Sequence, residues 1–218
     1  MKSNSWILVV TLGVLCILSA FLLCWHNVRQ SKDAADASES VIEILKNKIP
    51  DEYVDIPEAT PPSTEEDLFA EYEKDEPESK SDAGIVIDKN SYCGYISLPS
   101  LGLELPVMSD WSYDKLNISP CRYSGSAETN DLIIAAHNFY SHFGKIDDLV
   151  SGDQIVFTNT LGKKYIYTVA YTEVIDGEDI TQMFSGQSEE WDLTLFTCTL
   201  SGKSRVTVRA DLVPEETT

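Results

Sequence analysis

The sequence has few basic residues, few histidines and few cysteines. Its 218 residues include 16 Lys or Arg against 36 Asp or Glu, so the formal net charge is −20. A chain this acidic repels nucleic-acid phosphates and has no basic stripe with interleaved aromatic residues, so no nucleic acid is expected as a partner. The three histidines and five cysteines form no CxxC pair and no spacing typical of a zinc site. We therefore predict no metal site and no cofactor.

The cysteine count also argues against a disulfide-stabilised scaffold. Five is an odd number and too small for such a framework. Two cysteines lie in an apolar N-terminal stretch, where a thiol behaves as a small hydrophobic group. Cys93 and Cys121 could form a disulfide in an extracellular domain, but two unrelated buried thiols would explain the same sequence. Cys198 remains as the candidate for chemistry.

The N-terminal stretch is typical of a membrane anchor. Residues 6–25 carry no charge and have a tryptophan at each end. A transmembrane helix needs about 20 apolar residues, whereas a cleaved signal has a shorter apolar core followed by a small-x-small site. We predict that residues 1–30 form an uncleaved signal anchor, with a cleaved signal as the alternative. The flanking charges, Lys2 before the span and Arg29 and Lys32 after it, give only a mild preference for an external C-terminus.

Residues 31–84 are predicted to form an acidic, largely disordered stalk. The segment is rich in Asp, Glu, Pro and Ser, and it cannot bury enough apolar area to offset the entropy lost on ordering. Such a chain acts as a self-repelling spacer between membrane and domain. Within it, Ser40 and Glu43 form a capping-box pattern, and four apolar residues that follow share one helical face. The alternative for this short part is a helix packed on the domain, with Val41, Ile44, Leu45 and Ile49 on its face.

Residues 85–218 have the pattern of a domain rich in β-strands. Short apolar runs alternate with turn residues, and the predicted strands are 92–98, 103–107, 132–137, 154–159, 163–175, 192–199 and 205–212. Short helices are predicted at 113–117, 143–149 and 180–184. Many short strands with few helices indicate a mainly all-β fold, a closed or nearly closed barrel of about seven to eight strands.

One predicted hairpin brings a thiol and a guanidinium together. If Ser201 and Gly202 form the centre of the turn, Cys198 lies opposite Arg205, and Arg209 lies two residue pairs further from the cysteine. Directly opposed side chains have Cβ atoms about 4.5–5.5 Å apart on one face of a sheet. A guanidinium there would stabilise a thiolate and the oxygen of a carbonyl under attack. The geometry therefore favours Arg205 over Arg209 as the functional arginine.

His137 is the candidate proton partner. It ends the apolar run 132–137, and a histidine at the end of a buried strand can stand beside a thiol on a neighbouring strand. It would pair with the thiolate as an imidazolium and later protonate a leaving amine. From spacing alone, a structural histidine and an inert buried cysteine remain the alternative.

Three segments of the domain match motifs of a known family. Residues 194–198 read TLFTC, which matches the TLxTC segment around that family's nucleophile, and Arg205 follows one short loop later. Residues 136–138 read AHN, like the family's histidine segment, and the chain order His, Cys, Arg agrees. Over about residues 90–212 the sequence resembles the sortases, cysteine transpeptidases of Gram-positive cell surfaces. The resemblance implies three catalytic residues, His137, Cys198 and Arg205.

The resemblance also implies a reaction and partners. A sortase of this kind would be anchored in the cell membrane with its catalytic domain outside. It would cleave an LPxTG-like sorting signal of secreted surface proteins through a thioester, and transfer the acyl group to an amine of a peptidoglycan precursor or a pilin-like protein. The alternatives are a membrane-tethered cysteine protease and a surface domain that only binds. The loop after the cysteine is short for the family, which leaves subclass and sorting motif open. The expected substrate-binding residues are Asn138, Met183, Phe184 and Thr197.

Overall fold

A computed structural model describes residues 5–51, 53, 84–183 and 191–214. One long helix, α1 (Ser5–Lys48), leads to a barrel that carries a second, one-turn helix, α2 (Tyr113–Leu116). Three short 3-10 turns are η2 (Pro99–Leu101), η3 (Ile146–Asp148) and η4 (Ile180–Met183). The strands are β1 (Ile85–Ile87), β2 (Asn90–Leu98), β3 (Leu103–Met108), β4 (Cys121–Ser124), β5 (Leu132–Ala135), β6 (Gln154–Asn159), β7 (Lys164–Asp176), β8 (Leu193–Cys198) and β9 (Ser204–Leu212).

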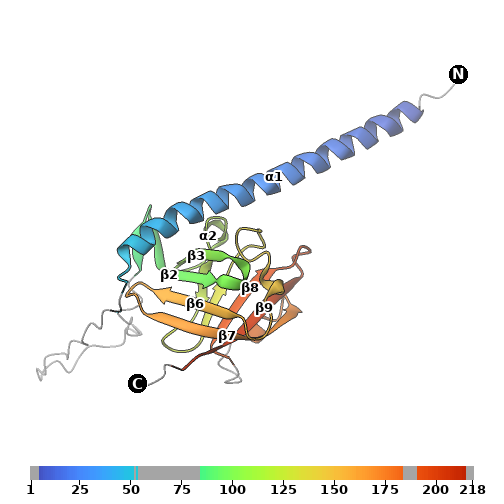
Figure 1. Ribbon diagram of the computed structural model, residues 1–218. Helices are drawn as coiled ribbons and strands as arrows, with labels where there is room; N and C mark the ends of the chain where they lie inside the picture. The colour runs from blue at the N-terminus through green and yellow to red at the C-terminus, as the bar shows by residue number, and fades with distance from the viewer. Residues whose placement is uncertain (1–4, 52, 54–83, 184–190, 215–218) are drawn as a thin grey trace, which may run out of the picture.

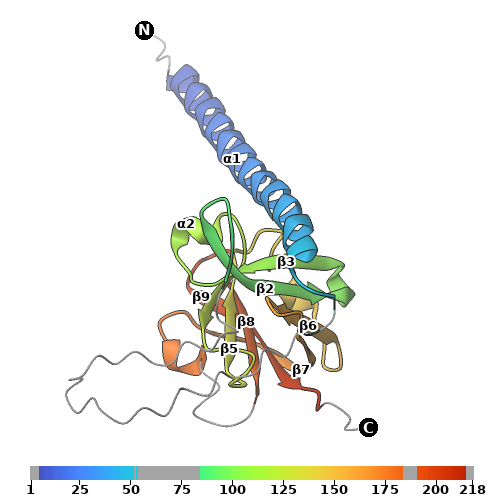
Figure 2. The same cartoon turned by 90° about the vertical axis from the view of Figure 1, so that its left-hand side faces the viewer.

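Eight of the strands close into a barrel. Their order is β2-β3-β4-β5-β8-β9-β7-β6, and the pairing of β6 with β2 completes the ring (Figures 1 and 2). The ninth strand, β1, pairs antiparallel with the first residues of β2. Gly94 makes this closure possible, because a Cβ there would lie 2.1 Å from the carbonyl oxygen of Thr158 on β6. The closed β-barrel predicted from the sequence is confirmed.

The barrel is filled by the alternating apolar residues of its strands. On β8, Leu193 and Leu195 are fully buried and belong to the central cluster, together with Val208 and Ala210 of β9. Since successive side chains of a strand point to opposite faces, the even-numbered residues of β8 point away from that interior. Cys198 is one of them, and it is half-buried. The core alternation therefore sets the face on which the thiol is presented.

All seven predicted strands are present, with ends shifted by at most two residues. The sequence missed β1 and β4, because three and four residues are too few to show a period. The run predicted to end at His137 stops as a strand at Ala135, so the histidine lies just beyond the sheet. Of the predicted helices, α2 is confirmed, whereas η3 and η4 are 3-10 turns.

The structure corrects the predicted boundary between anchor and stalk. α1 continues without a break from the apolar stretch to Lys48, so residues 31–48 are helical rather than disordered. Three of the four apolar residues predicted to share a face are buried against strands β1 to β4. Ser40 does not begin the helix, because its hydroxyl donates to the Ala37 carbonyl within it. The rest of the predicted stalk, residues 54–83, lies outside the described residues.

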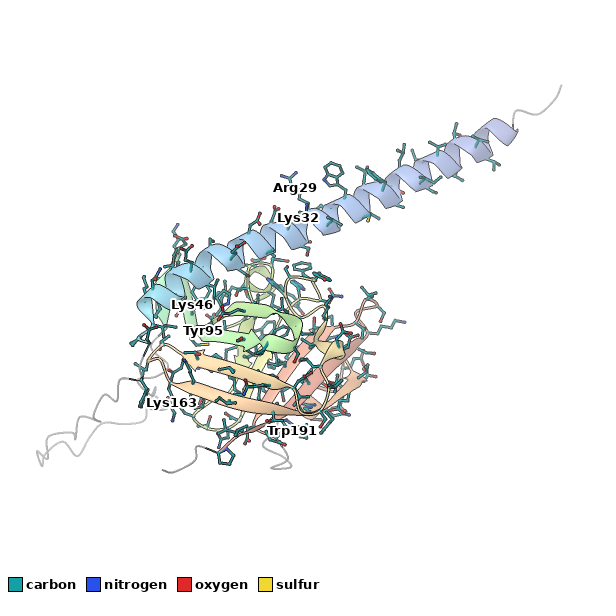
Figure 3. The ribbon with its side chains drawn as sticks, viewed as in Figure 1. Arg29, Lys32, Lys46, Tyr95, Lys163 and Trp191 are labelled. Atoms are coloured by element: carbon teal, nitrogen blue, oxygen red, sulfur yellow. The ribbon has the colours of Figure 1, made fainter. Side chains whose placement is uncertain are left out.

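Polar contacts flank this apolar stripe. The Lys46 ammonium lies 2.5 Å from a Glu104 carboxylate oxygen on β3 and 5.7 Å from the centre of the Tyr95 ring on β2 (Figure 3). Lys48 donates to the Val86 carbonyl at 3.5 Å. These pairs are exposed and contribute little energy by themselves. The buried stripe supplies the stability that orders this part of the chain, and the charged pairs fix its direction across the barrel.

Truncating the stripe should destabilise the whole domain. Leu45 is fully buried, so Leu45→Ala should lower the free energy of unfolding of the full-length chain by about 2–5 kcal/mol, measured by urea denaturation in detergent. Ile44 is the matched control, since its side chain is 41% exposed on the same turn. Ile44→Ala should change stability by less than about 0.5 kcal/mol. Equal losses from both variants would contradict the docking of α1.

Candidate active site

The β8–β9 hairpin has the register that the sequence predicts. Cys198 pairs with Arg205, and Thr194 pairs with Arg209. The connecting turn needs a glycine, because Gly202 has a φ of 71°, and its N–H donates to the Thr199 carbonyl at 2.9 Å. A short turn of fixed geometry thus places the guanidinium of Arg205 across the hairpin from the thiol.

A second set of contacts brings His137 beside this hairpin. β5 runs parallel to β8, and beyond its last residue the Ala136 N–H donates to the Phe196 carbonyl at 3.2 Å. The Thr197 hydroxyl donates to the Ala136 carbonyl at 2.9 Å. Both polar groups of Ala136 are therefore held by β8, and the next residue, His137, is delivered to the end of that strand next to Cys198.

His137, Cys198 and Arg205 all line one pocket. Its volume is about 290 Å³, and the three predicted catalytic side chains are each half-buried in its wall. The remaining lining residues come from the β3–β4 connection, β4, β5, β8 and the end of β7: Trp111, Tyr113, Leu116, Tyr123, Ala135, Ala136, Phe196 and Gly177. The structure therefore unites a thiol, an imidazole and a guanidinium from three separate segments around one cavity.

The electrostatics of the pocket suit proton transfer. Burial lowers the pKa of His137, so the imidazole is neutral near pH 7 and can accept a proton from the thiol. Nη1 of Arg205 donates to the carbonyls of Gly202 and Ser204 at 2.9 and 3.1 Å, which fixes the guanidinium at the pocket edge. Gly177 leaves room for it, because a Cβ there would lie 2.7 Å from that Nη1.

Four aromatic residues that line the pocket form a row, called here the aromatic wall: Trp111, Tyr113, Tyr123 and Phe196. The Trp111 ring lies 5.8 Å from Tyr113 and 5.2 Å from Tyr123, and Tyr123 lies 5.3 Å from Phe196, which is on the same strand as Cys198. Such a row offers a large apolar surface with polar edges to a bound peptide. Sequence reasoning missed it, because Trp111 and Tyr113 sit in an irregular connection where no period marks an exposed aromatic as functional.

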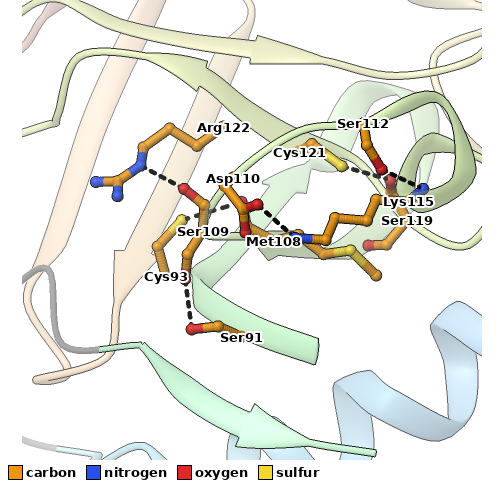
Figure 4. Close-up of polar contacts among 10 residues, drawn as sticks. All are labelled: Ser91, Cys93, Met108, Ser109, Asp110, Ser112, Lys115, Ser119, Cys121 and Arg122. Atoms are coloured by element: carbon orange, nitrogen blue, oxygen red, sulfur yellow. Dashed lines mark hydrogen bonds and ion pairs between the residues drawn. The ribbon is translucent and has the colours of Figure 1, made fainter. Parts of the chain in front are cut away.

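Polar contacts hold that connection in place (Figure 4). The Ser112 hydroxyl accepts from the Lys115 backbone N–H at 3.2 Å and caps α2, while Lys115 pairs with Asp110. Nε of Arg122 donates to the Ser109 carbonyl at 2.9 Å. Since these contacts bracket Trp111 on both sides, the aromatic wall is built on a fixed frame.

The two other cysteines of the domain are free and buried (Figure 4). The Cys93 thiol donates to the Val107 carbonyl at 3.5 Å, and the Cys121 thiol donates to the Ser119 carbonyl at 3.4 Å. The disulfide that the sequence left open is therefore absent from the structure. Burial raises the pKa of Cys121 to about 12, which keeps this thiol protonated and unreactive. Among the domain's thiols in the described residues, Cys198 alone lines the active-site pocket.

Arg209 has a structural environment instead. Its side chain is fully buried, with Nε 3.0 Å from a Glu173 carboxylate oxygen and Nη1 2.8 Å from the Thr194 hydroxyl. Its guanidinium carbon lies 4.4 Å from the centre of the Trp191 ring. It does not line the pocket. The cross-strand register had predicted this division between the two arginines.

The predicted substrate-binding residues have different positions. Thr197 is buried, and its hydroxyl contacts Ala136 rather than the cavity. Asn138 is half-buried next to His137. Met183 ends η4, and its side chain is outside the described residues, as is all of Phe184. Within the described ranges, no group of three or more His, Cys, Asp or Glu side chains is placed to hold a metal ion.

Comparisons with known proteins identify the family of this chain. A sortase domain model matches residues 96–213, more than half of the chain, and the protein belongs to the sortase family. No curated protein matches it. Sortase C1 from Streptococcus agalactiae is 26% identical with a TM-score of 0.52, over 62% of this chain and 75% of that one. A Clostridium perfringens sortase C solved with its C-terminal cell wall sorting motif is 25% identical with a TM-score of 0.50, over 57% and 72%. A Clostridium perfringens sortase D5 transpeptidase shares the fold at 24% identity and a TM-score of 0.50, over 58% and 82%.

Proposed function

We propose that this protein is a membrane-anchored cysteine transpeptidase that cleaves an LPxTG-like sorting signal and transfers the acyl group to an amine. The family implies a cell-wall transpeptidase in general. The observation that carries the finer proposal is the pocket that unites His137, Cys198 and Arg205. A thiol, a neutral imidazole and a fixed guanidinium around one cavity are the groups that acyl transfer through a thioester requires.

The first half of the reaction forms the acyl-enzyme. The imidazole of His137 takes the thiol proton, and the sulfur of Cys198 attacks the scissile carbonyl carbon. Arg205 stabilises the negative charge that develops on the carbonyl oxygen. When the tetrahedral species collapses, the carbon–nitrogen bond breaks, and His137 gives its proton to the departing amine. A thioester on Cys198 remains.

The second half resolves the thioester. An incoming amine attacks the same carbonyl carbon, His137 accepts a proton from its nitrogen, and Arg205 again stabilises the oxyanion. Collapse breaks the carbon–sulfur bond, forms a new amide and returns a proton to the thiol. The amine is proposed to belong to a peptidoglycan precursor or a pilin-like protein. Asn138 and the segment from Met183 to Phe184 are proposed to contact the sorting peptide.

The membrane is the proposed location. α1 is the one helix among the described residues that is long and apolar enough to span a bilayer, and the side chains described in its first half are exposed. We propose that residues 6–25 cross the membrane and that the barrel lies outside the cell, where sorting signals and cell-wall amines meet. Trp25 and Arg29 would then stand at the outer surface.

The amine dependence of product formation tests this proposal. The full-length protein in detergent is mixed with a panel of LPxTG-like peptides, with and without oligoglycine or lysine-containing peptides, and products are identified by mass spectrometry. We expect new amide products that form only with an amine present. Hydrolysis alone, at a rate unaffected by amines, would replace the transferase by a cysteine protease. Absence of cleavage across the panel, together with an unreactive Cys198, would indicate a binding domain.

A further inference from the structure

The helix that carries the membrane span also holds the loop that carries His137. This loop, residues 137–144, follows β5 and folds back on itself: the N–H groups of His142 and Gly144 both donate to the Phe139 carbonyl at 2.9 Å. Phe143 N–H donates to the His137 carbonyl at 3.2 Å. The loop is thus a compact unit in which His137 and His142 cannot move independently.

α1 contacts this unit at two points. The Ser141 hydroxyl donates to the Ser31 carbonyl at 3.1 Å. About two helical turns further along α1, the Ser38 hydroxyl lies 3.3 Å from Nε2 of His142. Ser38 and His142 are 3% and 0% exposed, so this is a buried polar contact between segments 104 residues apart in the chain.

The donor at the Ser38 contact follows from its other partner. A serine hydroxyl has one hydrogen, and Ser38 donates it to the Ile118 carbonyl at 3.1 Å. Ser38 must therefore accept the hydrogen of Nε2 of His142. Burial, followed by the nearby charge of His137, lowers the pKa of His142 to about 4, so this imidazole is neutral. The ring is thus held by α1, which contacts it at Ser38 and at the Ala34 backbone.

Aromatic contacts extend this arrangement into the pocket. The Phe139 ring lies between the two histidines, 5.6 Å from His142 and 4.9 Å from His137, with interplanar angles of 45° and 37°. Phe139 is 8% exposed, so it has little freedom to turn. A series of contacts therefore runs from α1 to the proposed catalytic imidazole: Ser38 contacts His142, His142 contacts Phe139, and Phe139 contacts His137.

α1 also makes hydrogen bonds to the segment that follows α2, on another side of the pocket. Ser38 holds the Ile118 carbonyl, and Gln30 donates to the Asn117 side chain at 2.9 Å. Both partners directly follow α2, whose Leu116 lines the pocket below the aromatic wall. One helix thus fixes the histidine loop and the α2 wall relative to each other.

We propose that Ser38 and His142 are positioning residues, which hold the His137 imidazole toward Cys198 and make the juxtamembrane part of α1 an integral part of the active site. This inference rests on the proposed function, since it assigns His137 as the proton partner of the thiol. Positioning matters at this level, because a displacement of about 1 Å in a catalytic group can cost a hundredfold in rate.

The reactivity of Cys198 tests the proposal without knowledge of the substrate. Iodoacetamide alkylates thiolates, so its rate against pH reports how well His137 stabilises the Cys198 thiolate. The full-length protein in detergent is labelled between pH 5 and 9, and the Cys198 peptide is quantified by mass spectrometry. The other titratable or charged groups around this pocket are Tyr113, Tyr123 and Arg205. Ser38→Ala should slow labelling at pH 7 about tenfold and raise the midpoint by about one pH unit.

Matched variants test whether Ser38 acts by positioning the His137 imidazole. Ser40→Ala removes an exposed hydroxyl from the same helix and should leave the profile unchanged. Ser141→Ala, which removes the second helix contact, should move the profile in the direction of Ser38→Ala. Profiles of folded Ser38→Ala and Ser141→Ala that coincide with wild type, while His137→Ala shifts, would overturn the positioning role and leave the proposed function intact. A wild-type Cys198 that labels no faster than in His137→Ala would instead overturn the proposed function.

Discussion

Replacing Cys198 with alanine should abolish the covalent peptidyl-enzyme adduct and lower amine-dependent transfer by at least about 1000-fold. The sulfur is the atom that carries the acyl group between the two halves of the proposed reaction, and nothing else in the described part of the pocket offers a thiol. Intact-mass spectrometry after incubation with an intact LPxTG-like peptide that the protein cleaves would show the adduct on the wild-type chain and none on Cys198→Ala.

Cys93→Ala is the control for this experiment. Cys93 is 5% exposed and lies on β2, away from the catalytic pocket, so its removal deletes a thiol without touching the proposed reaction. The adduct should still form. If Cys198→Ala retains an adduct of the same mass, the acyl group is carried by another residue, and the nucleophile assignment is wrong.

Replacing the two arginines of β9 should have opposite consequences. Arg205→Ala should lower kcat/KM by about 100- to 1000-fold with little change in the free energy of unfolding, because it removes a half-buried guanidinium at the pocket edge that is proposed to stabilise the oxyanion. Arg209→Ala should instead destabilise the domain by about 3–5 kcal/mol, because it removes a fully buried side chain, leaves a cavity and deprives the buried Thr194 hydroxyl of its donor. Steady-state kinetics and urea denaturation of the full-length variants measure the two effects.

Arg205→Ala and Arg209→Ala together test whether the first arginine serves activity and the second serves stability. Arg205→Lys is an informative companion, since it keeps the charge but loses the planar donor geometry, and should recover only part of the rate. A folded Arg209 variant that is catalytically dead, beside an active Arg205→Ala, would exchange the roles of the two residues. The cross-strand register would then have misidentified the functional arginine.

The parts of the site that follow from local rules could be predicted from the sequence. A short loop centred on Ser201 and Gly202 determines which residues of β8 and β9 face each other, so the Cys198–Arg205 pair could be deduced before any coordinates. The barrel followed from the period-two runs in the same way. The assignment of His137 depended on the resemblance. This residue comes close to β8 through the parallel pairing of β5 with β8, and sequence periodicity does not specify which strands pair.

The parts that depend on distant contacts could not be predicted. Residues 31–48 look like an acidic spacer, and the sequence offered a helix packed on the domain only as the alternative for a short part of it; the cluster with residues of β1 to β4 shows why Val41 and Leu45 are buried. The aromatic wall is equally hidden, since Trp111 and Tyr123 meet only after the β3–β4 connection folds over the sheet. The contact between His142 and Ser38 is hidden as well, because it joins segments that are 104 residues apart in the chain.

The unbroken course of α1 limits where the enzyme can work. With residues 6–25 in the bilayer, the first contact between helix and barrel, at Gln30, comes only five residues later, about 7–8 Å along the helix axis. Lys48 at the end of α1 donates to the Val86 carbonyl of β1, so the end of the helix lies against the barrel. Anchored as proposed, the pocket would search a thin layer next to the lipid. Its encounters would then depend on lateral diffusion in the membrane, which would favour donors and acceptors that are themselves lipid-bound over those embedded deeper in the wall.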